Sequence, residues 1–160
     1  MVAYLTGTVE NCYSKAAVTT NITNIVYAGG LIGHIDSTGV AKNCYASGHI
    51  SAISTSGFAY AGGFVGSNAG TIEGAVAFGN VKAQGSNEVY SRNGGFVATN
   101  EGTLTECYKD ETQILTKYTT IGNVYCEDGI GASSSDIINY CKDNWSSSIW
   151  DFNGSTPKFK

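Results

Sequence analysis

The sequence predicts an all-β protein folded as a parallel, right-handed β-solenoid (a β-helix), and three observations lead to this fold class. A unit of about 32 residues recurs between Gly7 and Tyr108. Glycine accounts for 21 of the 160 residues and Pro occurs once, a mixture that suits short strands and tight turns. Charged residues make up 14% of the chain, well below the usual quarter of a globular protein.

The repeat has two halves. The first starts with Gly and runs into a small residue followed by Tyr or Val, and its copies are Gly7–Tyr13, Gly39–Tyr45, Gly70–Val76 and Gly102–Tyr108. The second joins a double glycine to an apolar pair, and its copies are Tyr27–Gly33, Tyr60–Gly66 and Asn93–Ala98. A period this regular indicates one supersecondary unit that is stacked on copies of itself.

Residues at the same position in successive copies of the repeat form a column, and the residue types of a column predict whether its side chains enter the core. Three columns are apolar or small and should point inward: Val9, Ala41, Ile72 and Leu104; Cys12, Cys44, Ala75 and Cys107; Val18, Ile50 and Val81. One polar column should face water: Glu10, Lys42, Glu73 and Thr105. Asn11, Asn43 and Gly74 share a place, and because Asn and Gly both tolerate positive φ, a left-handed turn is expected there.

The apolar pairs after the double glycines complete about three short strands per repeat: Leu31/Ile32, Phe64/Val65 and Phe96/Val97. Stacked in register, these strands predict a solenoid of three to four coils over residues 1–121. A β-propeller is the alternative, but its blades repeat every 40 to 50 residues or so, and the copies here are too few to close a ring.

The C-terminal part, residues 122–160, departs from the repeat and is expected to cap the solenoid. Ser133 to Asp136 has the form that starts helices, and Ile137, Cys141 and Trp145 then recur on one face, so a helix is predicted at about 134–145. With the aromatic tail that follows, this helix should cover an open end of the solenoid. The chain opens inside a repeat, so we expect a piece of a longer protein whose upstream repeats cover the N-terminal edge, an edge that in isolation could support a homodimer.

The five cysteines leave the disulfide state open. Neighbouring coils lie about 4.8 Å apart, which would permit a bridge between Cys12 and Cys44. Ala75 occupies the same column, which favours free, buried thiols. Cys126 and Cys141 lie outside the repeat and could pair with each other.

Several function classes are disfavoured by the sequence. A net charge of −4 without a Lys/Arg cluster argues against nucleic-acid binding, and no apolar run is long enough to cross a membrane. The carboxylates are scattered apart from Glu106, Asp110 and Glu111, and His34 and His49 fall in different columns. No cofactor, metal site or catalytic constellation is predicted.

The tyrosine column formed by Tyr13, Tyr45 and Tyr108 is the candidate binding feature. If the rings face outward, they form an aromatic strip of the kind that binds sugars or proteins; if they face inward, they belong to the core. Each tyrosine directly follows a residue of the inward-facing cysteine column, and successive side chains of a strand point to opposite faces, which favours the outward direction. The corner beside this column weakens that expectation.

The second half of the repeat resembles the GLUG motif. Gly30-Leu31-Ile32-Gly33 matches the motif literally, Gly63-Phe64-Val65-Gly66 matches with Phe for Leu, and Gly95-Phe96-Val97-Ala98 is a degraded copy. The resemblance implies a large secreted or surface-attached bacterial protein, adhesin-like or a surface peptidase, in which the repeats are not catalytic. We therefore expect a non-catalytic extracellular module that binds a host or matrix protein or a glycan, or forms a stalk. Two alternatives stay open, a pure spacer and an accessory domain of a surface peptidase or glycan-processing enzyme.

Overall fold

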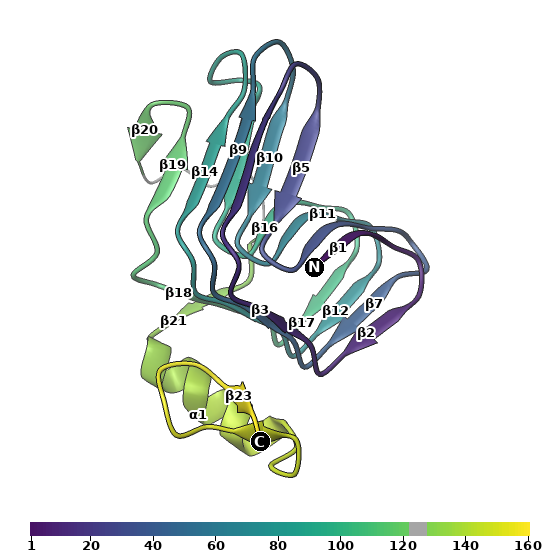
Figure 1. Ribbon diagram of the computed structural model, residues 1–160, viewed down its shortest axis with the longest axis vertical. Helices are drawn as coiled ribbons and strands as arrows, with labels where there is room; N and C mark the ends of the chain where they lie inside the picture. Colours follow the sequence, from purple (N-terminus) through teal and green to yellow (C-terminus); the bar gives the residue numbers. More distant parts are fainter. Residues whose placement is uncertain (122–127) are drawn as a thin grey trace.

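A computed structural model describes residues 1–121 and 128–160 and confirms the predicted fold class: strands of successive repeats stack in parallel as a β-solenoid of about four coils (Figure 1). Five sheets run along the solenoid, and each is named here by its first strand. The β1 sheet contains β1 (Val2–Leu5), β6 (Ile32–Ile35), β11 (Val65–Asn68) and β16 (Val97–Asn100). The β2 sheet contains β2 (Thr8–Glu10), β7 (Val40–Lys42), β12 (Thr71–Glu73) and β17 (Thr103–Thr105).

The other three sheets complete each coil. The β3 sheet contains β3 (Tyr13–Ser14), β8 (Tyr45–Ala46), β13 (Val76–Ala77), β18 (Tyr108–Asp110) and β21 (Ile130–Ala132). The β4 sheet contains β4 (Val18–Ile22), β9 (Ile50–Ser54), β14 (Val81–Gln84) and β19 (Leu115–Lys117), with β20 (Thr120–Ile121) antiparallel to β19. The β5 sheet contains β5 (Val26–Gly29), β10 (Ala59–Gly62) and β15 (Ser91–Gly94).

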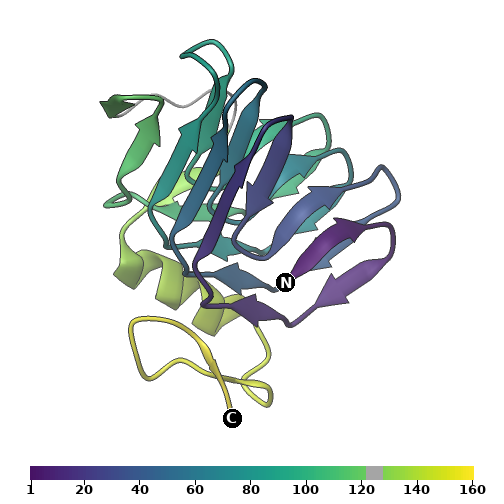
Figure 2. The same cartoon turned by 45° about the horizontal axis from the view of Figure 1, so that its top comes forward.

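The coil therefore has five strand positions, where the sequence predicted about three. The two that were missed are the strands of two or three residues in the β3 sheet and the strands of the β5 sheet, each of which ends on the first glycine of a double glycine. Between β5 and β6 the chain bends so tightly that a Cβ on Gly29 would lie 1.9 Å from the Ile32 carbonyl oxygen. Glycine at this place separates β5 from β6 and gives the coil a re-entrant corner (Figures 1 and 2).

The interior follows the predicted columns. Leu31, Phe64 and Phe96 stack inside the coils, and the rings of Phe64 and Phe96 lie parallel at a centroid distance of 5.0 Å. Cys44, Ala75 and Cys107 are buried beside them, as predicted. A second cluster, built around Ile50 and Val81, fills the lobe between the β4 and β5 sheets. A Cβ on any glycine of the second half of the repeat would lie within 2.7 Å of another atom, and these glycines are Gly29, Gly30, Gly33, Gly62, Gly63, Gly66, Gly94 and Gly95.

The predicted left-handed turn is confirmed at Asn11, Asn43 and Gly74, whose φ angles are 52°, 49° and 63°. The same place in the last coil is held by Glu106 with φ 51°, although neither Gly nor Asn occupies it. This turn lets the chain leave the β2 sheet and enter the β3 sheet, which restores the inward direction of the cysteine column.

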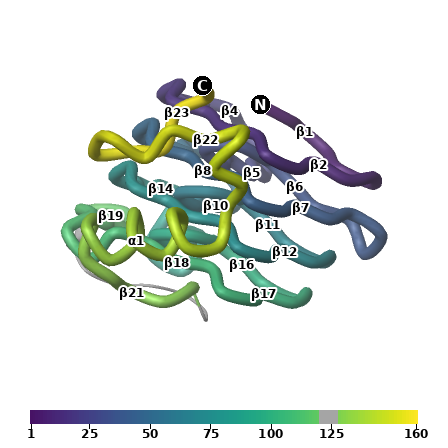
Figure 3. The backbone as a smooth tube through the Cα atoms, turned by 90° about the horizontal axis from the view of Figure 1, so that it is seen from below, coloured from purple at the N-terminus to yellow at the C-terminus, as the bar shows by residue number. Residues whose placement is uncertain are grey.

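The predicted helix is present as α1 (Ser134–Asn144), with the Ser133 side chain accepting a hydrogen bond from the backbone N–H of Asp136. Its position differs from our expectation. Together with the hairpin of β22 (Trp150–Asp151) and β23 (Lys158–Phe159), α1 lies along the outer face of the β3 sheet and not across an open end (Figures 1 and 3). The outer face of that sheet carries large apolar side chains, and burying them is the physical reason for this arrangement.

The C-terminal end is closed at the re-entrant corner by one side chain. In the inner coils, the N–H groups of Gly63, Phe64 and Val65 donate to carbonyl oxygens of the next coil. At the last coil, the corresponding N–H groups of Gly95, Phe96 and Val97 donate to the Asp128 carboxylate at 2.5, 2.7 and 2.6 Å. Asp128 thus replaces the two carbonyl groups of a further coil.

Lys109 completes this arrangement, since its ammonium group lies 2.6 Å from the second carboxylate oxygen of Asp128. Burial raises the pKa of Asp128, whereas the ion pair with Lys109 and the backbone N–H groups of Val97 and Phe96 act in the opposite direction and favour the charged carboxylate.

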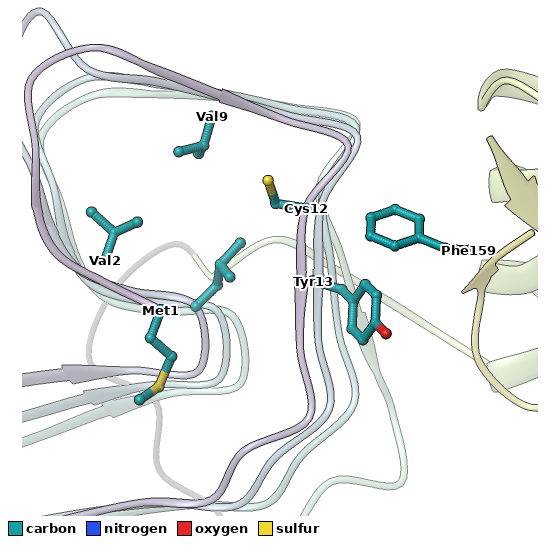
Figure 4. Close-up of a pocket in the computed structure, with 7 residues that line it drawn as sticks. Met1, Val2, Val9, Cys12, Tyr13 and Phe159 are labelled. Atoms are coloured by element: carbon teal, nitrogen blue, oxygen red, sulfur yellow. The ribbon is translucent and has the colours of Figure 1, made fainter.

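The N-terminal end is open. A hollow of about 360 Å³ enters the solenoid there and is lined by Met1, Val2, Val9, Cys12, Tyr13, Leu31 and Phe159. Cys12 and Tyr13 point to opposite sides of the coil wall, Cys12 into the interior and Tyr13 toward Phe159 of the tail (Figure 4). Strands β1 to β5 are the edge strands of the five sheets at this end of the solenoid.

The four described cysteines are free: Cys12, Cys44, Cys107 and Cys141. The Cys12–Cys44 bridge that the spacing would permit is therefore not formed, and the backbone N–H of Cys12 lies 3.3 Å from the Cys44 sulfur. Burial raises the pKa of the Cys44 thiol to about 12, as expected for a packed and unreactive group. Cys126 lies outside the described residues, so its pairing with Cys141 is not addressed. No helix among the described residues is long and apolar enough to span a membrane.

Candidate binding groove

The tyrosine column predicted as a binding strip does face away from the coil interior, but it is not an open strip. Tyr45 is fully buried beneath Trp150 and Phe152 of the tail. Tyr108 is half-buried against Tyr140 of α1, with ring centroids 4.6 Å apart. Tyr13 alone is exposed. The column therefore faces the direction that its parity predicts, and its exposure is decided by α1 and the residues that follow it, here called the α1–tail segment (Ser134–Lys160).

A different set of aromatic side chains lines an open groove at the re-entrant corner, which we call the corner groove. Its two walls are the outer faces of the β1 and β5 sheets, which meet at an angle (Figures 1 and 2). On the β1 sheet the register aligns one residue from each coil: Tyr4, His34, Ser67 and Thr99. On the β5 sheet it aligns a second column: Tyr27, Tyr60 and Arg92.

The rings of these columns stack along the solenoid axis. Tyr4 lies on His34 with ring centroids 4.9 Å apart, and Tyr27 lies on Tyr60 at 4.6 Å. The two columns also touch each other, because the rings of Tyr27 and His34 meet edge to face at 6.0 Å. Parallel strands place equivalent side chains about one ring thickness apart, so in-register aromatic residues form such ladders without distortion.

The C-terminal part of the groove carries the positive charge. The guanidinium of Arg92 lies 5.1 Å from the ring of Phe58 and 5.3 Å from the ring of Tyr60. Phe58 also packs edge to face with Tyr90 at 4.4 Å. These contacts hold the Arg92 head group against the aromatic surface, where it adds a cationic edge to the groove.

The N-terminal part of the groove is the most open. Tyr4 is 58% exposed and Tyr27 is 42% exposed, whereas Tyr60 is only 9% exposed. A hollow of about 360 Å³ lies here, lined by Ala3, Tyr4, Tyr27 and His34. The Tyr4 hydroxyl donates a 2.8 Å hydrogen bond to Asp36, and this bond, with those from Thr38 and Ser37, holds the pKa of Asp36 below its ordinary value.

This arrangement is suited to binding. It combines exposed ring surface with hydroxyl, imidazole and guanidinium groups along a concave surface, a mixture typical of sites that recognise amphipathic ligands. Within the described residues, no group of three or more His, Cys, Asp or Glu side chains could hold a metal ion. His49, the second histidine of the sequence, lies elsewhere and accepts a hydrogen bond from the backbone N–H of Asn80.

Sequence reasoning missed the corner groove, although its residues were visible in the repeat. Tyr27 and Tyr60 stand one repeat apart, each two residues before a double glycine. Tyr4 and His34 are paired in the same way across the first two coils. The sequence does not show that these two columns lie side by side, because their proximity depends on the angle of the re-entrant corner and not on the repeat period.

A β-solenoid with an aromatic groove on its side belongs to the broad class of repeat proteins that present extended surfaces. No known family matches the sequence, and no curated protein matches it either. The GLUG resemblance thus stays at the level of the motif residues.

A solved structure described as "a putative immunoglobulin A1 protease from Bacteroides ovatus" has a similar fold, with a TM-score of 0.77 and 25% sequence identity. The similarity covers 96% of this chain and 48% of that chain, so this chain spans about half the length of that protein.

Proposed function

We propose that this chain is a non-catalytic extracellular module of a larger bacterial protein, secreted or attached to the cell surface, and that it binds its ligand in the corner groove. The observation that carries the proposal is the pair of stacked aromatic columns, Tyr4–His34 and Tyr27–Tyr60, which meet on a concave and partly exposed surface. The similarity to a bacterial protein about twice as long supports the assignment to a larger protein.

The exposure and the stacking of these rings favour a binding role. Soluble proteins expose single aromatic side chains without consequence, but a contiguous set beside polar groups marks interaction sites. Aromatic rings supply a large contact area, and stacking on a neighbouring ring fixes their orientation before a ligand arrives. A prearranged groove of this kind loses little conformational entropy on binding. A stalk without a ligand has no need of such a groove.

The test is binding of the purified chain to an array of glycans and extracellular-matrix proteins. The Tyr27→Leu and Tyr4→Leu variants should each lose about fivefold or more in affinity, because ring contacts of this type are worth about 1 kcal/mol or more. Tyr13→Leu is the matched control, since it removes an exposed tyrosine from the opposite flank.

Circular dichroism and thermal unfolding should show that all three variants fold. A loss of binding in Tyr13→Leu, with the groove variants unaffected, would return the site to the originally predicted tyrosine column. An absence of binding to every target by a folded chain would favour the spacer alternative.

The similarity to the putative immunoglobulin A1 protease favours a second candidate, an accessory module that holds a protein substrate for a peptidase. In that case the chain should bind immunoglobulin A1 and leave it intact. Co-sedimentation with immunoglobulin A1, followed by electrophoresis of the antibody chains, separates binding from cleavage. Cleavage by the purified chain would contradict both candidates.

A further inference from the structure

A second hollow lies on the other side of the lobe that the β4 and β5 sheets enclose. It occupies the outer face of the β4 sheet, near the end that follows the β3 sheet, and its volume is about 320 Å³. The β4 and β5 sheets form opposite walls of the lobe, so this hollow and the corner groove lie on different sides of the molecule (Figure 1). Six polar side chains line the hollow, which we call the donor notch: Thr19, His49, Ser51, Asn80, Lys82 and Thr116.

The repeat brings these side chains together from four coils. The register of the β4 sheet aligns four of them in one column: Thr19, Ser51, Lys82 and Thr116. His49 and Asn80 stand two residues before Ser51 and Lys82, so they project from the same face. The coils that carry His49 and Lys82 each have a described coil on both sides. A further coil at either end of the solenoid would therefore add to a sheet edge and not to this face.

Backbone groups fix the polarity of His49 and Asn80. The N–H of Asn80 donates to His49 Nδ1 at 3.1 Å, which places the proton of the neutral imidazole on Nε2. The N–H of Ile114 donates to Asn80 Oδ1 at 2.9 Å, so the Asn80 amide is left with its NH₂ group. Both side chains thus have their acceptor atoms occupied and present donors to a ligand.

The charged group of the notch is a cation. Among the described residues, the ion pairs of lysine join Lys42 to Glu73 and Lys109 to Asp128, and no carboxylate pairs with the Lys82 ammonium. None of the side chains that line the notch is acidic. The hydroxyl groups of the lining can donate as well. Several donors around one cation, with no carboxylate among them, are the complement of an oxyanion.

From this geometry we infer that the donor notch binds the carboxylate or sulfate group of an acidic glycan. Lys82, His49 Nε2 and Asn80 Nδ2 are the donors for the oxyanion. The Thr and Ser hydroxyls both donate and accept, which suits the neighbouring hydroxyl groups of a sugar. An acidic peptide has less to bind, because the inner strands of the β4 sheet are paired on both sides and offer no edge to an extended chain. This site goes beyond the proposed function, which concerns the corner groove.

The experiment is a titration of the whole chain, labelled with nitrogen-15 and followed by proton–nitrogen correlation NMR. Methyl β-glucuronide and N-acetylglucosamine 6-sulfate carry the two anions, methyl β-glucoside and N-acetylglucosamine are their neutral counterparts, and triglutamate is the peptide probe. We expect at least one acidic sugar to shift the amide signals of Asn80, Lys82 and Ile114 with millimolar affinity, about fivefold or more tighter than its neutral counterpart. Added salt should weaken this binding. The tighter of the two acids identifies the anion.

Two variants and two controls test the geometry. Asn80→Asp keeps the oxygen that accepts from Ile114 but replaces the amide donor with a negative charge, so it should weaken the acidic sugar by about tenfold or more. Lys82→Gln removes the cation and should cost about fivefold or more. Lys142→Gln makes the same charge change at an exposed position of α1 and should leave the affinity unchanged. Tyr27→Leu should also leave it unchanged, because Tyr27 belongs to the corner groove.

Several outcomes would overturn the inference. They are equal affinity for the acidic and neutral sugars, and unchanged affinity in a folded Asn80→Asp variant. Tighter binding of triglutamate than of both acidic sugars would overturn the assignment to a glycan. If Asn80→Asp fails to fold, then Lys82→Gln decides, and unchanged affinity in that variant would exclude the notch.

Discussion

Gly74 illustrates the backbone requirement of the turn between two sheets of the coil. It occupies the left-handed turn between the β2 and β3 sheets with φ 63°, and its carbonyl oxygen accepts a hydrogen bond from the Trp145 indole at 3.0 Å. A Cβ added to Gly74 would lie 2.9 Å from the Asn43 side-chain oxygen. The position thus combines a conformation that disfavours L side chains with a crowded contact to the α1–tail segment.

We therefore predict that Gly74→Ala lowers the free energy of unfolding by about 1 to 2 kcal/mol, the cost of placing a non-glycine residue in the left-handed region. Urea denaturation measures the change. Gly131→Ala is the matched control, because a Cβ there meets no atom within 4 Å, and its stability should stay within about 0.5 kcal/mol of the parent. Equal midpoints for the two variants would contradict the assignment.

At the scale of elements, the Asp128 carboxylate and the glycine corner of the last coil form a terminating unit. Asp128 satisfies three buried N–H groups that would otherwise bond to another coil, and Lys109 balances its charge. Exposed strand edges invite pairing with other chains, and filling donor sites with a side chain is one way to prevent it. The solenoid is thus stopped at this corner by a side chain, while β21 extends only the β3 sheet.

Asp128→Ala should destabilise the chain by about 3 to 5 kcal/mol, because it leaves Lys109 unpaired and three buried donors without acceptors. Asp128→Asn should cost less, because its amide oxygen can still accept from Phe96 and Val97. Chemical denaturation of both variants, with the exposed Asp143→Ala as the control, measures the order. A smaller loss for Asp128→Ala than for Asp128→Asn would show that Asp128 does not act as an acceptor for these groups.

At the scale of the molecule, the two ends of the solenoid differ. The last coil has the Asp128 terminator, and α1 and the tail cover the flank from Tyr108 back to Tyr13. The first coil offers open strand edges and the apolar hollow at Val2, Val9 and Leu31. Each coil of a solenoid is stabilised mainly by its neighbours, so a coil with one neighbour should open more easily than one with two.

Hydrogen exchange should therefore show a gradient along the chain. We expect the hydrogen-bonded amides of β2 and β3 to have protection factors at least about tenfold lower than those of β12 and β13 in the middle coils. Mass spectrometry of peptides from each coil provides the measurement, with the peptide that contains Gly95 to Val97 as the protected reference. Uniform protection across all coils would indicate that the chain opens as a single unit.

The sequence by itself determined the fold class, the inward columns, the left-handed turns at Asn11, Asn43 and Gly74, and the helix start at Ser133. These features depend on period, residue size and local φ preference, all of which are local properties of the chain. Only the tertiary structure decided which outward column stays open. In the Tyr13–Tyr45–Tyr108 column, Tyr45 is buried and Tyr108 half-buried because α1 and the tail fold back onto them, and Tyr13 alone stays exposed. The Tyr4 and Tyr27 columns meet because the glycine corner turns two sheets toward each other. Both outcomes depend on contacts between segments distant in sequence, which a repeat period cannot encode.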